Sequence, residues 1–198
     1  VRAADVDHDG DLDLFVSGRN VPFQYPKGTV SRLLRNDSKP GAIHFVDVTK
    51  SLAPELLQEA MHCDAVWTDY NQDGWQDLVV AGEFAPIQVF QNTKGHLKKL
   101  ADTGLEHATG LWGSITAADF DQDGDMDFVA GNMGKNTLLR ANAKQPVEVL
   151  HGDLDGNGVY DVFPFVYFQN AEGTPISAPL FGKDDTHKQM NSTRPRFV

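Results

Sequence analysis

The chain of 198 residues contains a single cysteine, Cys63, and carries a formal net charge of −11 at pH 7. This acidic balance argues against a nucleic-acid partner, because phosphate binding needs a basic face, and it favours a cation as a partner instead. No run of the chain approaches the roughly 18–20 apolar residues of a membrane span, so we expect no transmembrane segment, and a lone cysteine excludes an intrachain disulfide.

A nine-residue template occurs four times along the chain. Aspartate stands at position one, aspartate or asparagine at positions three and five, glycine at position six and aspartate at position nine. The four copies are DVDHDGDLD (5–13), DYNQDGWQD (69–77), DFDQDGDMD (119–127) and DLDGNGVYD (153–161). Internal repetition of this kind is typical of repeat architectures, in which each repeat supplies one supersecondary unit.

Three segments typical of strands follow the first copy. DLFVSG (13–18) is an apolar run that ends at a glycine, and turn residues separate SRLLRN (31–36) from IHFVDVT (43–49). SLAPELLQEAM (51–61) then favours one turn or a short helix, with Ser51 as a possible N-cap.

Strand-like runs lie on both sides of the second copy. AVWT (65–68) precedes it, DLVVAG (77–82) follows directly, and IQVFQN (87–92) and HLKKLADT (96–103) complete the unit. The first aspartates of the first three loops are separated by 64 and 50 residues. These spacings suit four short strands per unit.

The third and fourth copies lie closer together. The strand-like runs around them are SITAA (114–118), DFVAGN (127–132), TLLRAN (137–142) and VEVLHG (147–152). After the fourth copy, DVFPFVYF (161–168) contains Pro164, which favours an edge strand or a bulge over a central strand. These two loops are only 34 residues apart, so the unit between them is abbreviated or the fourth unit begins early.

Many short strands in units of about 50 residues indicate an all-β fold, and a β-propeller rather than a sandwich or a barrel. Propellers carry four to eight blades, so four units would just close a small ring. The chain starts at VRAADVD without an initiator methionine and has an unfinished end, which favours a fragment of a larger ring of about seven blades. We predict that residues 1–198 form a propeller segment of about four repeat units, and that residues 182–198 connect it to a missing C-terminal part.

The spacing of the aspartate loops predicts a hard cation held by oxygen ligands. Oxygens at positions one, three, five and nine, with a glycine bend at position six and a backbone carbonyl at position seven, describe a loop wrapped round an ion such as Ca²⁺, which takes 6–8 oxygens in flexible geometry. The predicted side-chain ligands are Asp5, Asp7, Asp9, Asp13, Asp69, Asn71, Asp73, Asp77, Asp119, Asp121, Asp123, Asp127, Asp153, Asp155, Asn157 and Asp161. The predicted carbonyl ligands are those of Asp11, Trp75, Asp125 and Val159. We therefore expect up to four Ca²⁺ ions in these four loops.

Other interpretations of the loops are less favoured. An EF-hand needs a glutamate at position twelve, where the four loops hold Val16, Val80, Ala130 and Pro164. Acidic turns without a metal could explain one loop, but four such loops concentrate negative charge that destabilises the fold unless a counter-ion is present. No cysteine or histidine occupies a ligand position, which disfavours zinc and copper. A catalytic metal needs an open coordination position and a nearby acid or base, so we predict a structural ion.

The repeat and its flanks resemble the FG-GAP/VCBS repeats of integrin α-subunit propellers and of many bacterial exported proteins. DVDHDGDLDLFVSG (5–18) and DYNQDGWQDLVVAG (69–82) meet that family's motif well, and DFDQDGDMDFVAGN (119–132) is close to it. The segment RLLRNDSKPGAIHFVDVT (32–49) is more specifically similar to bacterial relatives of the cartilage acidic protein. DLDGNGVYDVFPFV (153–166) keeps the ligands but departs from the rest of the motif.

The resemblance implies calcium bound within each blade, between its first two strands. It also implies a secreted or cell-surface protein, exported by a bacterium, that serves adhesion or the recognition of proteins or carbohydrates. Asn71 and Asn157 replace aspartates of the family pattern, which should weaken the second and fourth loops.

The first functional hypothesis is a non-enzymatic binding or adhesion scaffold with an unidentified protein or glycan ligand. The alternatives are a calcium-dependent propeller enzyme, such as a polysaccharide lyase or hydrolase, and a purely structural spacer. No nucleophile elbow, P-loop or dinucleotide-binding motif occurs, so no catalytic residue is predicted. Trp67 and Trp112 are expected to pack between blades, whereas Trp75 is the best candidate for an exposed aromatic residue.

Overall fold

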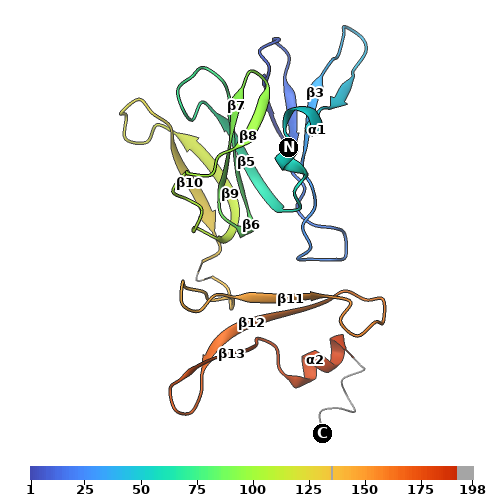
Figure 1. Ribbon diagram of the computed structural model, residues 1–198, viewed down its shortest axis with the longest axis vertical. Coiled ribbons are helices and arrows are strands. Elements are labelled where there is room, and N and C mark those ends of the chain that lie inside the picture. The colour runs from blue at the N-terminus through green and yellow to red at the C-terminus, as the bar shows by residue number, and fades with distance from the viewer. Residues whose placement is uncertain (135, 191–198) are drawn as a thin grey trace. The chain divides into compact units, whose positions relative to one another are not determined.

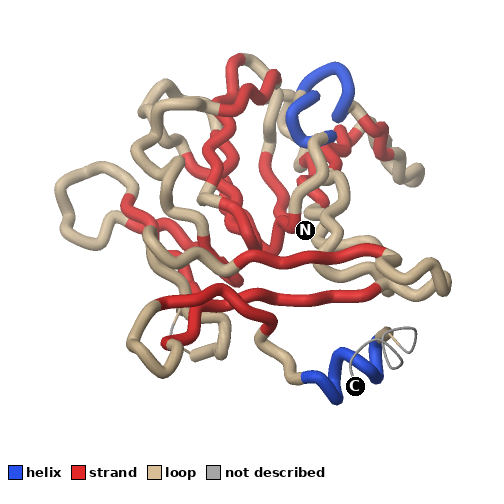
Figure 2. Tube along the Cα trace, turned by 60° about the horizontal axis from the view of Figure 1, so that its bottom comes forward, coloured by secondary structure: helices blue, strands red, loops and turns tan. Residues whose placement is uncertain are grey.

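The computed structural model describes residues 1–134 and 136–190. The chain divides into two compact units, the first made of Val1–Asn20 and Gly28–Met133 and the second of Val21–Lys27 and Gly134–Val198. Strands make up most of the regular structure of both units, and the helices are short (Figure 2). None of the described helices is long and apolar enough to cross a membrane. Residues 191–198, the end of the predicted C-terminal connection, lie outside the described residues.

The first sheet is an antiparallel meander at the start of the first unit (Figure 1). Its four strands follow chain order and are β1 (Arg2–Ala4), β2 (Asp13–Val16), β3 (Arg32–Asn36) and β4 (Phe45–Asp47). Leu14 of β2 lies opposite Ala3 of β1 on one side and Leu34 of β3 on the other. The strands predicted after the first aspartate loop are confirmed, and β1 adds a strand before it.

Two short helical segments follow β4. The α-helix α1 spans Thr49–Leu52 and the 3-10 helix η1 spans Pro54–Leu57, so the prediction of a helical turn is confirmed. The predicted cap is wrong, because Ser51 lies inside α1 and its hydroxyl donates a hydrogen bond to the carbonyl of Val48 at 3.0 Å. Leu56 of η1 is fully buried and joins the main core.

The second sheet of the first unit contains six strands. They are β5 (Met61–Thr68), β6 (Asp77–Ala85), β7 (Gln88–Thr93), β8 (His96–Lys99), β9 (Gly110–Ala118) and β10 (Asp127–Asn132). β5 to β8 form a second meander in chain order, which confirms the prediction of four strands in each of the first two units. β9 and β10 form a hairpin that joins this sheet where Glu83 of β6 pairs with Leu111 of β9.

The core of the first unit lies on both faces of β6. Leu78 and Val80 point into a cluster that contains Phe15 and Leu33 of the first sheet. Val79 and Ala81 point to the other face, into a cluster shared with Ile115 of β9. The consecutive apolar residues of β6 are therefore explained by burial on both sides, since neighbouring residues of a strand face opposite ways.

The segment TLLRAN (137–142), predicted as a strand, forms none in the structure. Leu138 is exposed, and Asn142 instead forms an isolated bridge with Gln145. The side-chain carbonyl of Asn142 accepts a hydrogen bond from the backbone N–H of Lys144, an asparagine turn that competes with a strand ladder. A run of this length forms a strand only when a neighbouring strand pairs with it. Its own residues do not supply that partner.

The described part of the second unit contains a three-stranded antiparallel sheet and one short helix. Its elements are β11 (Glu148–Gly152), β12 (Asp161–Gln169), β13 (Pro175–Pro179) and α2 (Lys183–Gln189). β12 lies between β11 and β13, so the prediction of an edge position for Pro164 is wrong. The carbonyl of Pro164 accepts a hydrogen bond from the N–H of Leu180, one residue beyond the end of β13. A central strand tolerates this proline because its missing N–H falls where the ladder with β13 ends.

Candidate metal centres

Each aspartate loop connects two consecutive antiparallel strands that pair with each other. The loops lie between β1 and β2, β5 and β6, β9 and β10, and β11 and β12. The first three loops belong to the first unit and the fourth belongs to the second unit. A two-strand connection of this kind brings positions one and nine of the template together, since they lie at the facing ends of two paired strands.

The carboxylate at position one caps the backbone of its own loop. In the second loop, both oxygens of Asp69 accept hydrogen bonds, one from the N–H of Asp73 at 2.9 Å and one from the N–H of Gly74 at 2.8 Å. The other three loops have the same pair of bonds, at 2.9–3.2 Å. Position one therefore holds the bend at positions five and six in one conformation.

The glycine at position six lies in the left-handed region in all four loops. Its φ angle is 96° at Gly10, 88° at Gly74, 98° at Gly124 and 83° at Gly158. Position four is also left-handed, with positive φ angles at His8, Gln72, Gln122 and Gly156. The amino-acid sequence carries only a partial signal for this second bend, because Gly156 and, to a lesser degree, His8 are residue types that favour it, whereas glutamine at the other two positions is not.

Replacing Gly74 with alanine should lower the free energy of unfolding by about 1–2 kcal/mol, the usual cost of a left-handed L-residue. A Cβ at Gly74 would have no heavy atom within 4 Å, so the effect is one of backbone conformation. Gly113→Ala in β9 is the matched control, since that site is equally open but has no left-handed φ angle. The measurement is urea unfolding in chelator, and equal losses in both variants would contradict the explanation.

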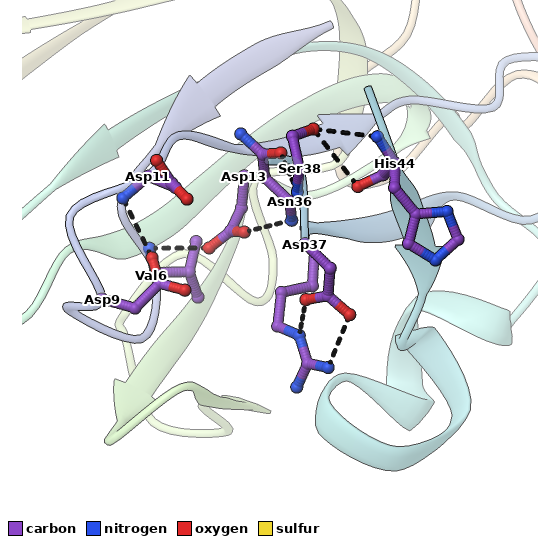
Figure 3. A network of polar contacts seen from close by, with 9 residues as sticks. Val6, Asp9, Asp11, Asp13, Asn36, Asp37, Ser38 and His44 are labelled. Atoms are coloured by element: carbon purple, nitrogen blue, oxygen red, sulfur yellow. Dashed lines mark hydrogen bonds and ion pairs between the residues drawn. The ribbon is translucent and has the colours of Figure 1, made fainter. Parts of the chain in front are cut away.

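The aspartate at position nine connects its loop to a neighbouring strand. Asp13 accepts a hydrogen bond from the N–H of Val6 at 3.1 Å and another from the N–H of Asn36, at the end of β3, at 2.8 Å (Figure 3). Asp77 has the same arrangement, with the N–H groups of Tyr70 at 3.0 Å and of Asn92 at 2.6 Å. Burial raises the pKa of both carboxyl groups, and nearby aspartates of the same loops add to this rise. Asp127 and Asp161 likewise each accept a hydrogen bond from the backbone N–H of position two in their own loop.

Positions one, three and nine form a tight cluster of carboxylates in three of the loops. Within each cluster, one oxygen from every residue lies within 4.8 Å of the others. The clusters are Asp5, Asp7 and Asp13; Asp119, Asp121 and Asp127; and Asp153, Asp155 and Asp161. The described part of the second loop forms no such cluster of three carboxylates, since position three is Asn71, whose amide donates a hydrogen bond to Asp73 at 2.8 Å.

The residues at position five lie apart from these clusters. Asp9, Asp73, Asp123 and Asn157 each accept a hydrogen bond from the N–H of position seven, at 2.7–3.1 Å. The residues that donate these bonds are Asp11, Trp75, Asp125 and Val159. The pKa of the Asp125 carboxyl group is raised, mainly by the negative charge of Asp123, so this loop concentrates charge even at an exposed position. The carbonyl ligands predicted at position seven stay a prediction.

The residues of the first loop fit a hard cation. Its clustered carboxylates supply the oxygen donors that Ca²⁺ prefers. One oxygen of Asp7, Oδ1, is buried and has no hydrogen-bond partner in the described part of the chain. A buried carboxylate oxygen without a partner is energetically costly, and a bound cation would satisfy it.

The three tryptophans lie in different surroundings. Trp67 of β5 packs against the core shared with the first sheet, and Trp112 of β9 packs against the second cluster. Their packing between blades stays a prediction. Trp75 is partly buried rather than exposed, because its ring stacks on that of His8 with centroids 3.9 Å apart and planes 6° apart. Position seven of the second loop therefore contacts position four of the first loop.

Comparison with known families gives one match. Residues 69–130 match the family model of the FG-GAP-like repeat. No curated protein matches the chain. The matched segment begins at the second aspartate loop, contains the third loop and ends within β10. The chain therefore carries an FG-GAP-like repeat at residues 69–130.

Proposed function

We propose that this chain is a calcium-binding segment of an extracellular β-propeller, in which calcium stabilises the blades and the propeller serves as a binding or adhesion scaffold. The observation that carries the proposal is the recurrence of one loop geometry at four places in the chain. In each loop, the position-one carboxylate fixes the bend, and the position-nine carboxylate joins the loop to the strands. In three loops these two groups converge with position three.

The ligands in the first loop would be Asp5, Asp7 and Asp13, with Asp9 and the carbonyl of Asp11 completing the set. A bound Ca²⁺ would supply positive charge that neutralises these carboxylates. The backbone N–H groups of Asp9 and Gly10 orient Asp5, and those of Val6 and Asn36 orient Asp13. The side chains are thus held in place by the loop and the sheet, so little ordering is needed on binding.

The packing of the first unit supports the propeller. Its first two meanders each contain four antiparallel strands, and they share one apolar core through Phe15, Leu33, Leu78 and Phe90. The hairpin of β9 and β10 contributes to a second core on the other face of the second meander. Four-stranded sheets stacked by their faces are the building units of propellers, and a larger ring of about seven blades would continue this stacking.

The proposed place of action is outside the cell or at its surface, and the proposed ligand is a protein or a glycan. The FG-GAP-like repeat at residues 69–130 supports a scaffold role, and the position of each loop within its sheet is consistent with a structural ion. A fold of this type does not by itself determine the ligand, so the ligand must be sought by screening glycans and matrix proteins.

Calorimetric titration of the calcium-free chain tests the metal sites directly. The Asp7→Asn variant is expected to weaken or remove one Ca²⁺-binding event, by about tenfold or more in affinity, since even outer-shell changes cost metal sites 10–100-fold. Asp11→Asn is the matched control, because it removes the same charge from the same loop but changes a side chain that is exposed and outside the carboxylate cluster. Equal effects of the two substitutions would show that the loop attracts calcium only through its charge, and an absence of binding by the wild-type chain would refute the proposal.

A further inference from the structure

The side chain of Asn92 connects the first two aspartate loops. Asn92 lies in β7 and is fully buried. Its amide nitrogen donates one hydrogen bond to the carbonyl of Val6 in the first loop at 2.9 Å and another to the carbonyl of Gln76 in the second loop at 3.1 Å. Both hydrogens of the amide are therefore used, and each is used by a different loop.

The remaining polar groups of Asn92 also act on these loops. Its backbone N–H donates to the carboxylate of Asp77, position nine of the second loop, at 2.6 Å. Its side-chain oxygen accepts a hydrogen bond at 2.8 Å from the N–H of Gly95, which lies in the turn between β7 and β8. Gly95 in turn lies against the first loop, since a Cβ built on it would stand 3.1 Å from the Cβ of Asp7. The turn is thus held between the buried amide of Asn92 and the Cβ of Asp7 in the first loop.

An aromatic contact joins the same two loops at the surface. His8, position four of the first loop, stacks on Trp75, position seven of the second. His8 lies between Asp7 and Asp9, and Trp75 carries the carbonyl predicted to bind an ion. The two loops are therefore connected by a buried polar bridge and by a partly buried ring stack, which involve different residues.

Asn36 holds the position in the first sheet that corresponds to Asn92 in the second, but none of its described contacts bridges two loops. Its backbone N–H donates to Asp13, as that of Asn92 does to Asp77. Its side-chain oxygen accepts a hydrogen bond from the N–H of Ser38, two residues away, and so serves only its own turn. The bridge is thus a property of Asn92 and not of every asparagine at this place in the repeat.

We propose that Asn92 is a positioning residue that makes calcium binding at the first two loops positively cooperative, an inference that rests on the proposed function. An ion in the first loop orders Val6 and Asp7. Through Asn92 and Gly95 the same ordering holds Gln76 and Asp77 in place, so the second loop loses less conformational freedom when it binds. Coupling of this kind typically changes affinity by 5–150-fold, and it is reciprocal between the two sites.

The coupling can be measured in a chain with only the first two loops active. Asp119→Asn and Asp153→Asn would remove the position-one carboxylates of the other two loops. Calorimetric Ca²⁺ titration of this chain, with and without Asp7→Asn, then gives the affinity of the second loop beside an intact or a weakened first loop. We expect the second loop to bind about tenfold more weakly when the first is weakened and still empty.

Substitution of the bridge should remove the coupling. With Asn92→Ala, the affinity of the second loop should change less than twofold when Asp7→Asn is added, whereas the control Asn36→Ala should keep the full tenfold difference. Asn92→Ala leaves buried carbonyls without partners, so Asn92→Ser provides a second variant if that chain fails to fold, because a hydroxyl has a single hydrogen to donate and cannot bridge both loops. Asparagine tolerates the left-handed φ angle at position four, and His8→Asn removes only the ring stack, so we expect it to reduce the coupling.

The outcomes separate the two proposals. If neither loop binds calcium, the proposed function fails. If both loops bind and the second is unaffected by Asp7→Asn, the metal sites stand and the coupling is refuted. If coupling is present but persists in full in a folded Asn92→Ala chain, or in Asn92→Ser where only that variant folds, the assignment of the bridge is overturned.

Discussion

Calcium at about 100 times its dissociation constant is expected to raise the free energy of unfolding by about 2.7 kcal/mol for each occupied loop. The folded chain holds three carboxylates within 4.8 Å of one another in each of three loops, and unfolding disperses them. Calcium is therefore expected to bind the folded state in preference to the unfolded chain. Three of the four loops lie in the first unit, so their combined contribution to that unit could reach about 8 kcal/mol if the sites act independently.

Thermal and urea unfolding in calcium and in chelator measure this effect. Magnesium at the same ionic strength is the control, because Mg²⁺ requires a stricter octahedral site and should raise the melting temperature less. The variant Asp5→Asn should lose part of the calcium effect, since Asp5 both belongs to the first cluster and fixes its bend. A melting temperature that millimolar calcium leaves unchanged would contradict a structural role for the ion.

Acidification in chelator is expected to destabilise the first unit through His62. This side chain is only 3% exposed, and its Nδ1 atom lies 2.7 Å from the hydroxyl of Ser31. Burial lowers the pKa of His62 to about 4, and the positive charge of Lys99 acts in the same direction. An unfolded histidine has a pKa of about 6.5. Between these two values the unfolded chain binds a proton that the folded chain does not, so stability falls as the pH decreases from about 6.5 to about 4, by about 3 kcal/mol in total.

The difference between the wild-type chain and His62→Gln isolates this effect. The raised pKa values of Asp13 and Asp77 act in the opposite direction, because their folded forms retain protons at a higher pH, but they contribute equally to both chains. Urea unfolding at several pH values should show a smaller decrease in the free energy of unfolding at acidic pH for His62→Gln than for the wild-type chain. His96→Gln, which changes an exposed histidine of β8, should show the same decrease as the wild-type chain. Parallel profiles for the wild-type chain and His62→Gln would refute the role of His62.

Several features of the fold follow from local sequence alone. The runs after each aspartate loop form strands because their apolar and β-branched residues suit a buried, pleated surface. The structure departs from the predictions in two places, where contacts with neighbouring residues determine the outcome. Pro164 lies in a central strand because its missing N–H falls beyond the end of β13, and residues 137–142 form no strand although their composition favours one. The place of Pro164 depends on Leu180, which is distant in the sequence, whereas at residues 137–142 the local turn at Asn142 also competes with a strand.

The sequence by itself determined the glycine bend of the four aspartate loops, because the hydrogen bonds that hold this bend span nine residues or fewer. Asp69 reaches the N–H groups of Asp73 and Gly74, and Asp77 reaches that of Tyr70, so the spacing of residue types is enough to specify the bend. Only the tertiary structure decided how the loops are connected. Asn92 lies 86 positions from Val6, and their hydrogen bond exists because apolar side chains of both sheets share one core that brings the first loop against β7. A contact of that range depends on the packing of whole sheets, which no local pattern of residues records.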